Sequence, residues 1–434
     1  MQVAKPKKGY KLVETGFGKY KEIPEDWETD LLQNMVEKIK AGGTPKSSEK
    51  AYYSGKIPFV TIHDITNSGK YLENTEKTIT EKGLSNSNAW LIPANSILFS
   101  MYASIGKAVF NRIPVVTHQG ILGIISNTKI IHSDFLFYFL TSINKTIQNY
   151  TNTGTQANLS LGIVKKIQVI YPSKIQEQQK IALILSNIDN AIQNVIQIIK
   201  QTENLRQNLL ELAFNGSLTE KWRKKIDFSY PWDEKKFGEL ILNSRNGFTG
   251  KPNDESIGIP RLGITSITRS TSVYANENIY RYIEIEKSKI NTYSVQKNDL
   301  LVCRQNGNEE FVGKFCVAKG LCSPMIFSDS LIRLRVKIDE ILPEYLVLFM
   351  NHRRGRNQIS KYISTTAGNY SINSTNLKKL KILLPKLKEQ KKIFSILSNI
   401  AVQLQKDRHY LSNLELLKMG LIQKLLTGKI RVKF

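Results

Sequence analysis

The side chains that most often do chemistry in proteins are present in this sequence but are not spaced for catalysis. The five histidines are scattered, and none lies three or four residues from another, as metal ligands on a helix would. The three cysteines form no Cys-X-X-Cys pair, so neither a disulfide framework nor a zinc site is indicated. No Gly-Lys pair is followed by Ser or Thr, which excludes a Walker A phosphate loop. We therefore expect that the chain itself does not catalyse a reaction.

The charge balance points to a polyanionic partner. The 434 residues include 62 Lys and Arg against 37 Asp and Glu, a formal net charge of 62 − 37 = +25. Such an excess favours nucleic acid, while a membrane surface or plainly solvated lysine-rich faces remain alternatives. No apolar segment follows Met1 and no apolar run reaches about eighteen residues, so we expect neither secretion nor a membrane span, and a cytoplasmic location.

The elements that must position any functional residue include one long helix, predicted for Gln176–Gly216. Pro172 precedes it and the next proline is Pro231, so the helix can run unbroken to Gly216, a suitable C-terminal stop. Its apolar positions alternate in steps of three and four residues, which is typical of a coiled-coil seam. The predicted seam is Ile181, Ile184, Ile188, Ala191, Val195, Ile198, Thr202, Leu205, Leu209 and Leu212.

The same helix occurs a second time. Glu177, Asn187 and Gly216 recur 212 residues later, since 389 − 177, 399 − 187 and 428 − 216 are all 212. The chain is therefore an internal tandem duplication. The second seam has a polar break at Asp407 and Arg408 and comprises Ile393, Leu397, Ile400, Leu404, Leu411, Leu414, Leu417, Leu421 and Leu425.

Each helix follows a globular segment of mixed α and β character. In the first, apolar runs predict strands at Ile57–Ile62, Ser96–Met101, Lys107–Phe110, Gly120–Ser126 and Ile167–Tyr171, and helical spacing predicts helices at Leu31–Ile39 and Asp134–Leu140. In the second, Asp299–Arg304 and Ser330–Val336 repeat two of these strands. The predicted order is a polar, flexible tail (1–21), a globular domain (22–172), a helical spacer (173–226), a second globular domain (227–385) and a C-terminal helical spacer (386–434).

This organisation predicts a mixed α/β (α+β) fold with a pseudo-two-fold repeat. Two amphipathic helices of equal length cannot bury their apolar stripes alone, so we expect them to pack together as an antiparallel coiled coil. A basic protein with two unlike globular domains at a set separation is suited to a bipartite DNA site. A coiled-coil scaffold that binds other proteins and a nuclease with an unrecognised active site are the competing interpretations.

In the order of its parts the sequence resembles the specificity subunits of type I restriction-modification systems. The resemblance covers about Ile23 to the C-terminus and is carried by Ile23–Trp27, Gly42–Pro45 followed by Tyr53, Gly55, Ile57 and Pro58, Ile97–Leu98 through Gly106–Lys107 to Gln119–Gly120, Asn158–Pro172 with its echo Ser371–Pro385, and the Glu-Gln openings of both helices. The second half has Asn246–Pro252 where the first has Gly-Gly-Thr-Pro, so the sequence leaves the equivalence of these loops open.

The resemblance implies that each globular domain is a target recognition domain that reads one half of a split site in double-stranded DNA. It implies that the helices act as a ruler and as the docking surface for two methyltransferase subunits. The chain would be a non-catalytic subunit of an adenine methyltransferase complex, joined by restriction subunits in the full assembly. S-adenosylmethionine, ATP and Mg²⁺ would be held by the partner subunits. A DNA-binding protein unrelated to restriction remains an alternative.

Under this interpretation, lysine, arginine and loop backbone hold phosphates, and a few polar side chains contact base edges. In the first domain, the predicted phosphate contacts are Gly43, Thr44 and Lys46, and the candidates for base-edge or backbone contact are Arg112, His118, Gln119 and Gln156. In the second domain, the candidates are Arg245, Lys251, Arg261, Arg304, Gln305, Asn306, Asn369 and Tyr370. No catalytic residue and no metal ligand is predicted.

Overall fold

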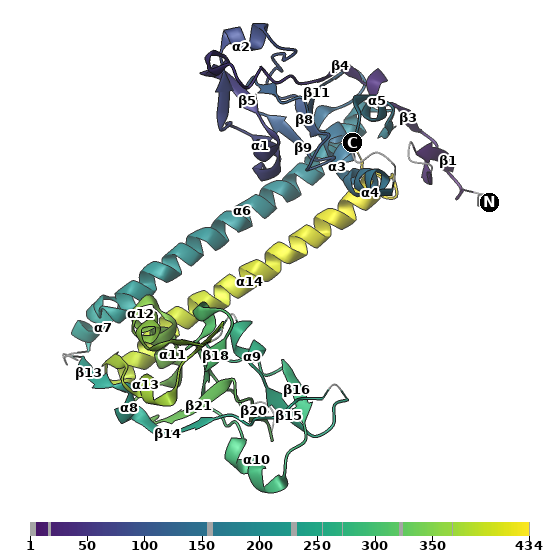
Figure 1. Cartoon of the computed structure of the whole chain (residues 1–434). Helices are drawn as coiled ribbons and strands as arrows, with labels where there is room; N and C mark the ends of the chain where they lie inside the picture. Colours follow the sequence, from purple (N-terminus) through teal and green to yellow (C-terminus); the bar gives the residue numbers. More distant parts are fainter. Residues whose placement is uncertain are drawn as a thin grey trace. The chain divides into compact units, whose positions relative to one another are not determined.

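The computed structural model describes residues 6–15, 19–153, 159–226, 232–253, 255–270, 272–320, 324–366 and 368–433. The chain forms two compact units: unit 1 consists of Met1–Ile196 and Tyr410–Phe434, and unit 2 of Gln197–His409. Each unit contains one end of each long helix, α6 (Ile175–Phe214) and α14 (Leu387–Leu425) (Figure 1). The two long helices predicted from the sequence are thus confirmed.

Unit 1 is built around two small sheets, with strand orders β4-β11-β8-β9-β6 and β10-β5-β7, and a separate pair of strands, β3 and β12. The strands are β3 (Trp27–Leu31), β4 (Val36–Ala41), β5 (Tyr53–Val60), β6 (Tyr71–Leu72), β7 (Lys77–Ile79), β8 (Ile97–Ser100), β9 (Ala108–Asn111), β10 (Val116–Thr117), β11 (Ile121–Ser126) and β12 (Gln168–Pro172). The short helices are α1 (Ile62–Asn67), α2 (Glu81–Ser85), α3 (Ser133–Ser142), α4 (Asn144–Thr153) and α5 (Leu161–Lys165). The five strands and the helix at α3 that the apolar patterns predict in this segment are confirmed.

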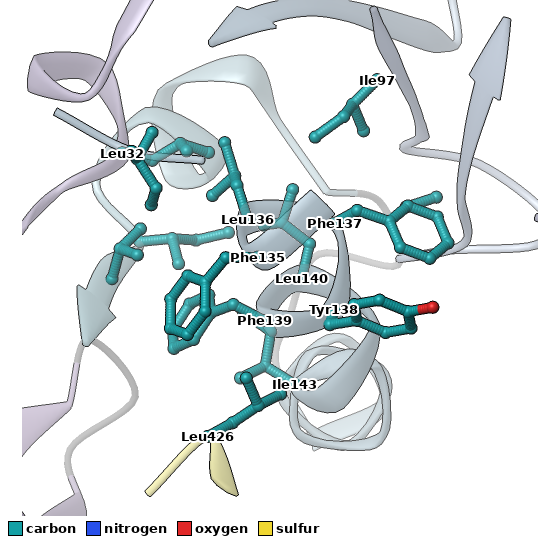
Figure 2. Close-up of a cluster of buried hydrophobic side chains, with 14 of the residues drawn as sticks. Leu32, Ile97, Phe135, Leu136, Phe137, Tyr138, Phe139, Leu140, Ile143 and Leu426 are labelled. Carbon is teal, nitrogen blue, oxygen red and sulfur yellow. The ribbon is translucent and has the colours of Figure 1, made fainter. Parts of the chain in front are cut away.

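Helix α3 lies at the centre of the unit 1 core. Its six consecutive residues Phe135–Leu140 are all buried, which requires partners on every side of the helix. Figure 2 shows them together with Leu32, Ile97 and Leu426, so the N-terminal region, a sheet strand and the C-terminal segment all contribute to one core. The hydroxyl of Tyr138 points out of the cluster.

Unit 2 repeats this plan with its own strands. Its sheets have the orders β14-β21-β17-β19, β16-β15-β20 and β18-β23-β22, and β13 pairs with β24. The strands are β13 (Asp233–Lys236), β14 (Ile241–Asn246), β15 (Ile259–Leu262), β16 (Tyr280–Ile283), β17 (Leu300–Cys303), β18 (Gln305–Asn306), β19 (Phe315–Val317), β20 (Ile326–Phe327), β21 (Leu331–Val336), β22 (Ser364–Thr366), β23 (Asn369–Ser371) and β24 (Lys381–Leu384). The helices are α7 (Glu220–Lys225), α8 (Phe237–Leu240), α9 (Thr265–Thr268), α10 (Lys287–Tyr293), α11 (Pro343–Asn351), α12 (Arg353–Ile359) and α13 (Ser374–Lys378). The order β14-β21-β17 matches β4-β11-β8, as the sequence repeat predicts.

The duplication also appears as repeated hydrogen bonds of two buried glutamines. Gln178 Oε1 accepts the backbone N–H of His132 at 2.8 Å, and Gln390 Oε1 accepts that of Leu342 at 2.7 Å. Both side-chain amides also donate to a proline carbonyl, at 2.9 and 2.8 Å. Both glutamines are fully buried, where an amide needs such partners. The glutamine that opens each long helix therefore fastens that helix to the globular part of its own unit.

The long helices run antiparallel within each unit. Polar contacts join successively later residues of the first helical region to successively earlier residues of the second. In unit 1 these contacts are Glu177 to Arg431 (2.7 Å) and Asp189 to Lys418 (2.6 Å), and in unit 2 they are Glu203 to Arg408 (2.5 Å) and Thr219 to Glu389. The predicted antiparallel pairing is confirmed inside both units.

The seam predicted for α6 is only partly correct. Ile181 and Val195 are buried and Ile184, Ile188 and Leu209 are partly buried, but Leu205 is 50% exposed. The buried apolar positions instead include Leu185, Ile192, Leu210 and Phe214. A straight helix has 3.6 residues per turn, so a strict heptad drifts away from the buried face, and here the globular part as well as the partner helix covers α6.

The seam predicted for α14 agrees with its burial except at Leu417, which is 48% exposed. Ile393, Leu397, Leu404 and Leu414 are buried, and Ile400 and Leu411 are partly buried.

Two predictions near the N-terminus are wrong. Leu31–Ile39 is not a helix: β3 ends at Leu31, a single 3-10 turn spans Leu32–Asn34, and β4 follows. Pairing of β4 with β11 holds the second half of this segment in an extended conformation, which local apolar spacing does not predict. The segment assigned to a polar tail includes a hairpin of β1 (Tyr10–Thr15) and β2 (Lys19–Pro24). Strand pairing and a bond from the Tyr10 hydroxyl to the Gly428 carbonyl (3.0 Å) order this segment.

Candidate nucleic-acid interface

In unit 2, a short polar ladder brings several predicted residues together. Strand β18 pairs with β23, placing Gln305 opposite Ser371 and Asn306 opposite Tyr370. The ladder borders a cavity of about 450 Å³ lined by Arg304, Gln305, Asn306, Ser330, Asn369 and Ser371. Arginine, glutamine and asparagine are the side chains that make paired hydrogen bonds to guanine or adenine edges. The arrangement therefore offers hydrogen-bond groups suited to base edges.

Arg304 is held where three segments meet. Its backbone N–H donates to the Ser330 carbonyl at 2.8 Å, and its own carbonyl accepts from Ile372 at 2.9 Å. Its Nη1 donates to the Asp329 carbonyl at 3.0 Å. Among the residues that the structure describes, this is the one hydrogen bond that the Arg304 guanidinium makes. A guanidinium carries five N–H donors, so most remain available to a ligand.

Arg261, by contrast, is not a surface residue. It is 8% exposed, and its Nη2 donates to the Asp329 carboxylate at 3.3 Å and to the Phe248 carbonyl at 3.2 Å. Burial is the main cause that lowers its pKa. The structure contradicts its prediction as a DNA contact, because an internal partner occupies the guanidinium. Arg261 instead holds Asp329, the residue whose carbonyl accepts from Arg304.

Arg245 and Lys251 are exposed. Arg245 lies on β14, and its guanidinium is 5.8 Å from the centre of the Tyr293 ring. Lys251 follows β14 in the chain, in the loop that begins at Gly247. Neither makes an ion pair with another residue that the structure describes. Both positions suit contacts to phosphate rather than to a particular base.

The glycine loop of unit 1 has a packing role. The backbone N–H of Gly42 donates to Ile121 O at 2.9 Å and that of Gly43 to Thr117 O at 3.0 Å. A Cβ on Gly42 would lie 2.1 Å from Thr117 O, and one on Gly43 would lie 2.3 Å from Ala89 N. The glycines are needed because other backbone passes too close for a side chain. The prediction that Gly43 offers its N–H to phosphate is wrong, since that N–H already has a partner.

The structure also settles the equivalence of the two glycine loops. Gly247 donates to Leu331 O, as Gly42 donates to Ile121 O, and its Cβ would lie 2.1 Å from Ser328 O. Gly42 and Gly247 therefore occupy the same place in the repeat. Phe248 then takes the place of Gly43.

Thr44 and Lys46, the other predicted phosphate contacts, differ in exposure. Lys46 has a side chain that is 73% exposed and a weak ion pair with Glu49 at 3.9 Å, which leaves its ammonium available. Thr44 is partly buried, and its hydroxyl has no hydrogen-bond partner in the part of the chain that the structure describes.

The remaining unit 1 candidates lie in two places. Arg112 stacks on Tyr71, 3.7 Å from the ring centre, and donates to Asn95 at 3.2 Å. His118 accepts the Gly120 N–H through Nδ1 at 3.0 Å, and burial lowers its pKa, so the ring is neutral at pH 7 with Nε2 as the donor. Gln119 beside it is exposed. Gln156 lies outside the described residues.

Sequence reasoning missed Ser330 and Ser371, which line the unit 2 cavity, and Tyr102 in unit 1. The internal repeat could have identified Tyr102, because it corresponds to a residue already predicted in the second domain. Met101 donates its N–H to Gly120 O as Arg304 donates to Ser330 O, so Tyr102 corresponds to Gln305. Tyr102 is 37% exposed and lies against Gly120, where a Cβ would be 2.4 Å from its ring.

The described ranges contain no group of three or more His, Cys, Asp or Glu side chains able to hold a metal ion. Burial raises the pKa of the Cys303 thiol to about 12 and of the Cys316 thiol to about 11, so both are unreactive. Within the same ranges, no helix has the length and apolar character needed to cross a membrane.

Comparison with known proteins gives a consistent result. The family model described as the type I restriction modification DNA specificity domain matches residues 24–204 and again 230–410. The chain is 27% identical over 383 residues to the type I restriction enzyme EcoKI specificity subunit of Escherichia coli K12, covering 86% of this chain and 81% of that protein. It is 26% identical over 382 residues to the StySPI specificity subunit of Salmonella potsdam, with the same two coverages.

A solved structure shares the fold. The crystal structure of a type I restriction-modification system S subunit from M. genitalium matches with a TM-score of 0.59 over 92% of this chain and 96% of that chain, at 16% identity. This likeness shows the fold alone, whereas the family model covers most of the chain and occurs once in each half. The chain therefore belongs to the specificity subunits of type I restriction-modification systems.

Proposed function

We propose that this chain selects the DNA sequence on which a type I complex acts, with each unit contacting one half of a bipartite site. The observation that carries the proposal is the polar ladder of unit 2, where Arg304 and Asn306 border one cavity beside the β18–β23 pair. Unit 1 presents His118, Gln119 and Tyr102 at the corresponding edge, so the two edges carry different side chains. Different side chains at equivalent places suit two different half-sites.

The chain would supply recognition and not catalysis. S-adenosylmethionine, ATP and Mg²⁺ are then required by methyltransferase and restriction partners, and the complex would act on DNA in the cytoplasm. A docking surface for two methyltransferase subunits is available on the long helices, which expose large apolar side chains within both units. These include Leu183, Ile196, Tyr410, Leu416, Leu417 and Met419 in unit 1, and Ile198, Leu205, Leu212 and Val402 in unit 2. Exposed apolar residues of this number are typical of a surface that another protein covers.

The decisive experiment is to co-express the chain with the methyltransferase subunit of its own system and map methylated adenines in the host DNA. The expected result is a single split motif whose two halves are both required. Methylation without a sequence preference, or a motif unchanged when the chain is omitted, would contradict the proposal. The purified chain should also bind the mapped duplex with an affinity that falls steeply with salt, which a scaffold that binds only proteins would not show.

A further inference from the structure

Unit 2 contains a second cavity, remote in sequence from the polar ladder. It has a volume of about 620 Å³ and lies between residues 269–270 and 272–278 and the helices α6, α11 and α14. Four basic side chains line it, Arg206, Arg269, Lys319 and Arg408, and none of the ladder residues does. Unit 1 has a cavity of about 540 Å³ that includes Lys70, Asp189 and Lys418. The duplication therefore allows one cavity to be compared with the other, residue by residue.

In unit 1 the cations of this cavity have internal partners. Lys70 contacts the Asp134 carboxylate at 2.7 Å and donates to the Ser186 hydroxyl at 2.8 Å. Asp189 receives the Lys418 ammonium at 2.6 Å and the Tyr138 hydroxyl at 2.6 Å. Positive charge at the helix pair is thus neutralised by a carboxylate of the same unit.

The repeat register identifies the corresponding residues in unit 2. Adding 212 takes Asp189 to Ala401 and Ser186 to Ser398, and subtracting 212 takes Lys418 to Arg206. The offset of 210 between His132 and Leu342, the two residues that bond the repeated glutamines, takes Tyr138 to Leu348. Unit 2 therefore keeps the cation as Arg206 but has lost the carboxylate and the phenol that face it.

Arg206 consequently has a charge that this cavity does not balance. It is partly buried, and it makes no hydrogen bond or ion pair with another residue that the structure describes. Burial, and then the neighbouring Arg408, lower its pKa, with Glu203 acting in the opposite direction. Glu203 is already paired with Arg408 at 2.5 Å. Both causes that lower the pKa disfavour the charged guanidinium, and both would be offset by a bound anion.

The carboxylate of Glu277 also lines the cavity but is turned toward backbone. It is 2% exposed and accepts the Gly320 N–H at 3.1 Å and the Lys319 N–H. The other wall is apolar and aromatic, with Tyr274, Leu348, Phe394 and Val402. The cavity thus joins a guanidinium-rich side to an apolar side.

We propose that this cavity binds an organic phosphate of mononucleotide size, with Arg206 as the principal ligand of the phosphoryl group. Guanidinium groups match the geometry of phosphate oxygens, and a lining of three arginines and a lysine favours a dianion over a single carboxylate. The volume lies within the range of about 300–1,000 Å³ typical of small-molecule sites, and the apolar wall suits a nucleobase. The site is distinct from the edge proposed to contact DNA.

AMP is a suitable probe, titrated by calorimetry into the full chain without DNA. The expected result is saturable binding of AMP, with adenosine at least tenfold weaker because it lacks the phosphoryl group. Arg206→Met should weaken AMP binding at least tenfold. Lys418→Met, the equivalent change in unit 1, should leave it within twofold, because that cation already has its own carboxylate.

A second variant keeps the test independent of folding. Ala401→Asp places a carboxylate where unit 1 has Asp189, so it should also weaken AMP binding at least tenfold while raising the melting temperature measured by circular dichroism. The absence of saturable AMP binding by the wild type, equal binding of adenosine and AMP, or unchanged binding by Arg206→Met would each overturn the proposal. An effect of Arg206→Met on duplex DNA binding without any binding of AMP would place Arg206 on the DNA path, and would also overturn it.

Discussion

Arg431, six residues after the end of α14, donates to both carboxylate oxygens of Glu177 at the start of α6, at 2.7 and 2.9 Å. Glu177 is buried, with a side chain only 2% exposed. In unit 2, Arg223 makes the equivalent contact with Glu389, but there both residues lie in the interior of the chain. The segment that follows α14 thus supplies the arginine for this ion pair in unit 1, and the segment that follows α6 supplies it in unit 2.

Replacing Arg431 by methionine should destabilise unit 1, because it leaves the buried Glu177 carboxylate without its main partner. Loss of one partner of a buried pair costs about 3–5 kcal/mol, and since Arg431 is 41% exposed we expect roughly 2 kcal/mol. Hydrogen exchange should show that backbone amides exchange faster in unit 1 and at an unchanged rate in unit 2. The double variant Glu177→Gln/Arg431→Met should be less destabilised than the sum of the single changes, and simple additivity would show that the pair does not interact.

Arg304→Ala should relax recognition at one position of one half-site. A side chain bonded to a base edge contributes about 1–3 kcal/mol of discrimination, so methylation mapping should show one base pair becoming degenerate. Lys251→Ala is the matched comparison, because a phosphate contact should weaken binding to all sequences equally and reduce the salt slope by about one. An equal loss at both half-sites on Arg304→Ala would mean that Arg304 is structural.

Gly42→Ala should destabilise unit 1 without changing any charge. The new Cβ would lie 2.1 Å from Thr117 O, a backbone atom that cannot move without disturbing the sheet, so we expect a cost of at least about 2 kcal/mol in urea unfolding. Gly69→Ala provides the control, since no heavy atom lies within 4 Å of its Cβ. Wild-type stability of Gly42→Ala would refute the packing role assigned to this glycine.

The stability of unit 1 should fall on mild acidification because of His118. Burial lowers its folded-state pKa below the ordinary value of 6.5, so the unfolded state takes up the proton first as the pH falls. The stabilising contribution is therefore full above pH 6.5 and is lost progressively below it. His118→Asn keeps an acceptor for Gly120 but cannot titrate, and its unfolding free energy should change less between about pH 7.5 and about pH 5.5. Identical pH profiles would exclude His118 as the cause.

Local pattern was sufficient for the long helices and for many strands. The proline-free, periodic stretch before Gly216 predicts α6 because helix formation depends on neighbours three and four residues apart, and Gly216 adopts φ +85° as a helix-ending glycine does. The same pattern did not predict which face of α6 is buried. Leu205 is exposed and Leu210 is buried because packing partners from distant parts of the chain decide that face.

The candidate site shows the same division. Sequence identified Arg304, Gln305, Asn306 and Asn369 as chemically suitable, and the β18–β23 ladder gathers them around one cavity. Sequence could not separate Arg304 from Arg261, since both are arginines near strand ends. Their environments differ because Asp329 offers its carboxylate to Arg261 and only its carbonyl to Arg304.

The sequence by itself determined the duplication, the paired helices, the positive charge and the family. Only the tertiary structure decided that Gly43 packs against backbone, that Gly42 and Gly247 are equivalent, and that Arg206 has lost the carboxylate that its counterpart Lys418 keeps. The physical reason is the range of the interactions. Helix periodicity and charge are properties of short segments, whereas a free or occupied donor depends on residues that meet only after the chain has folded.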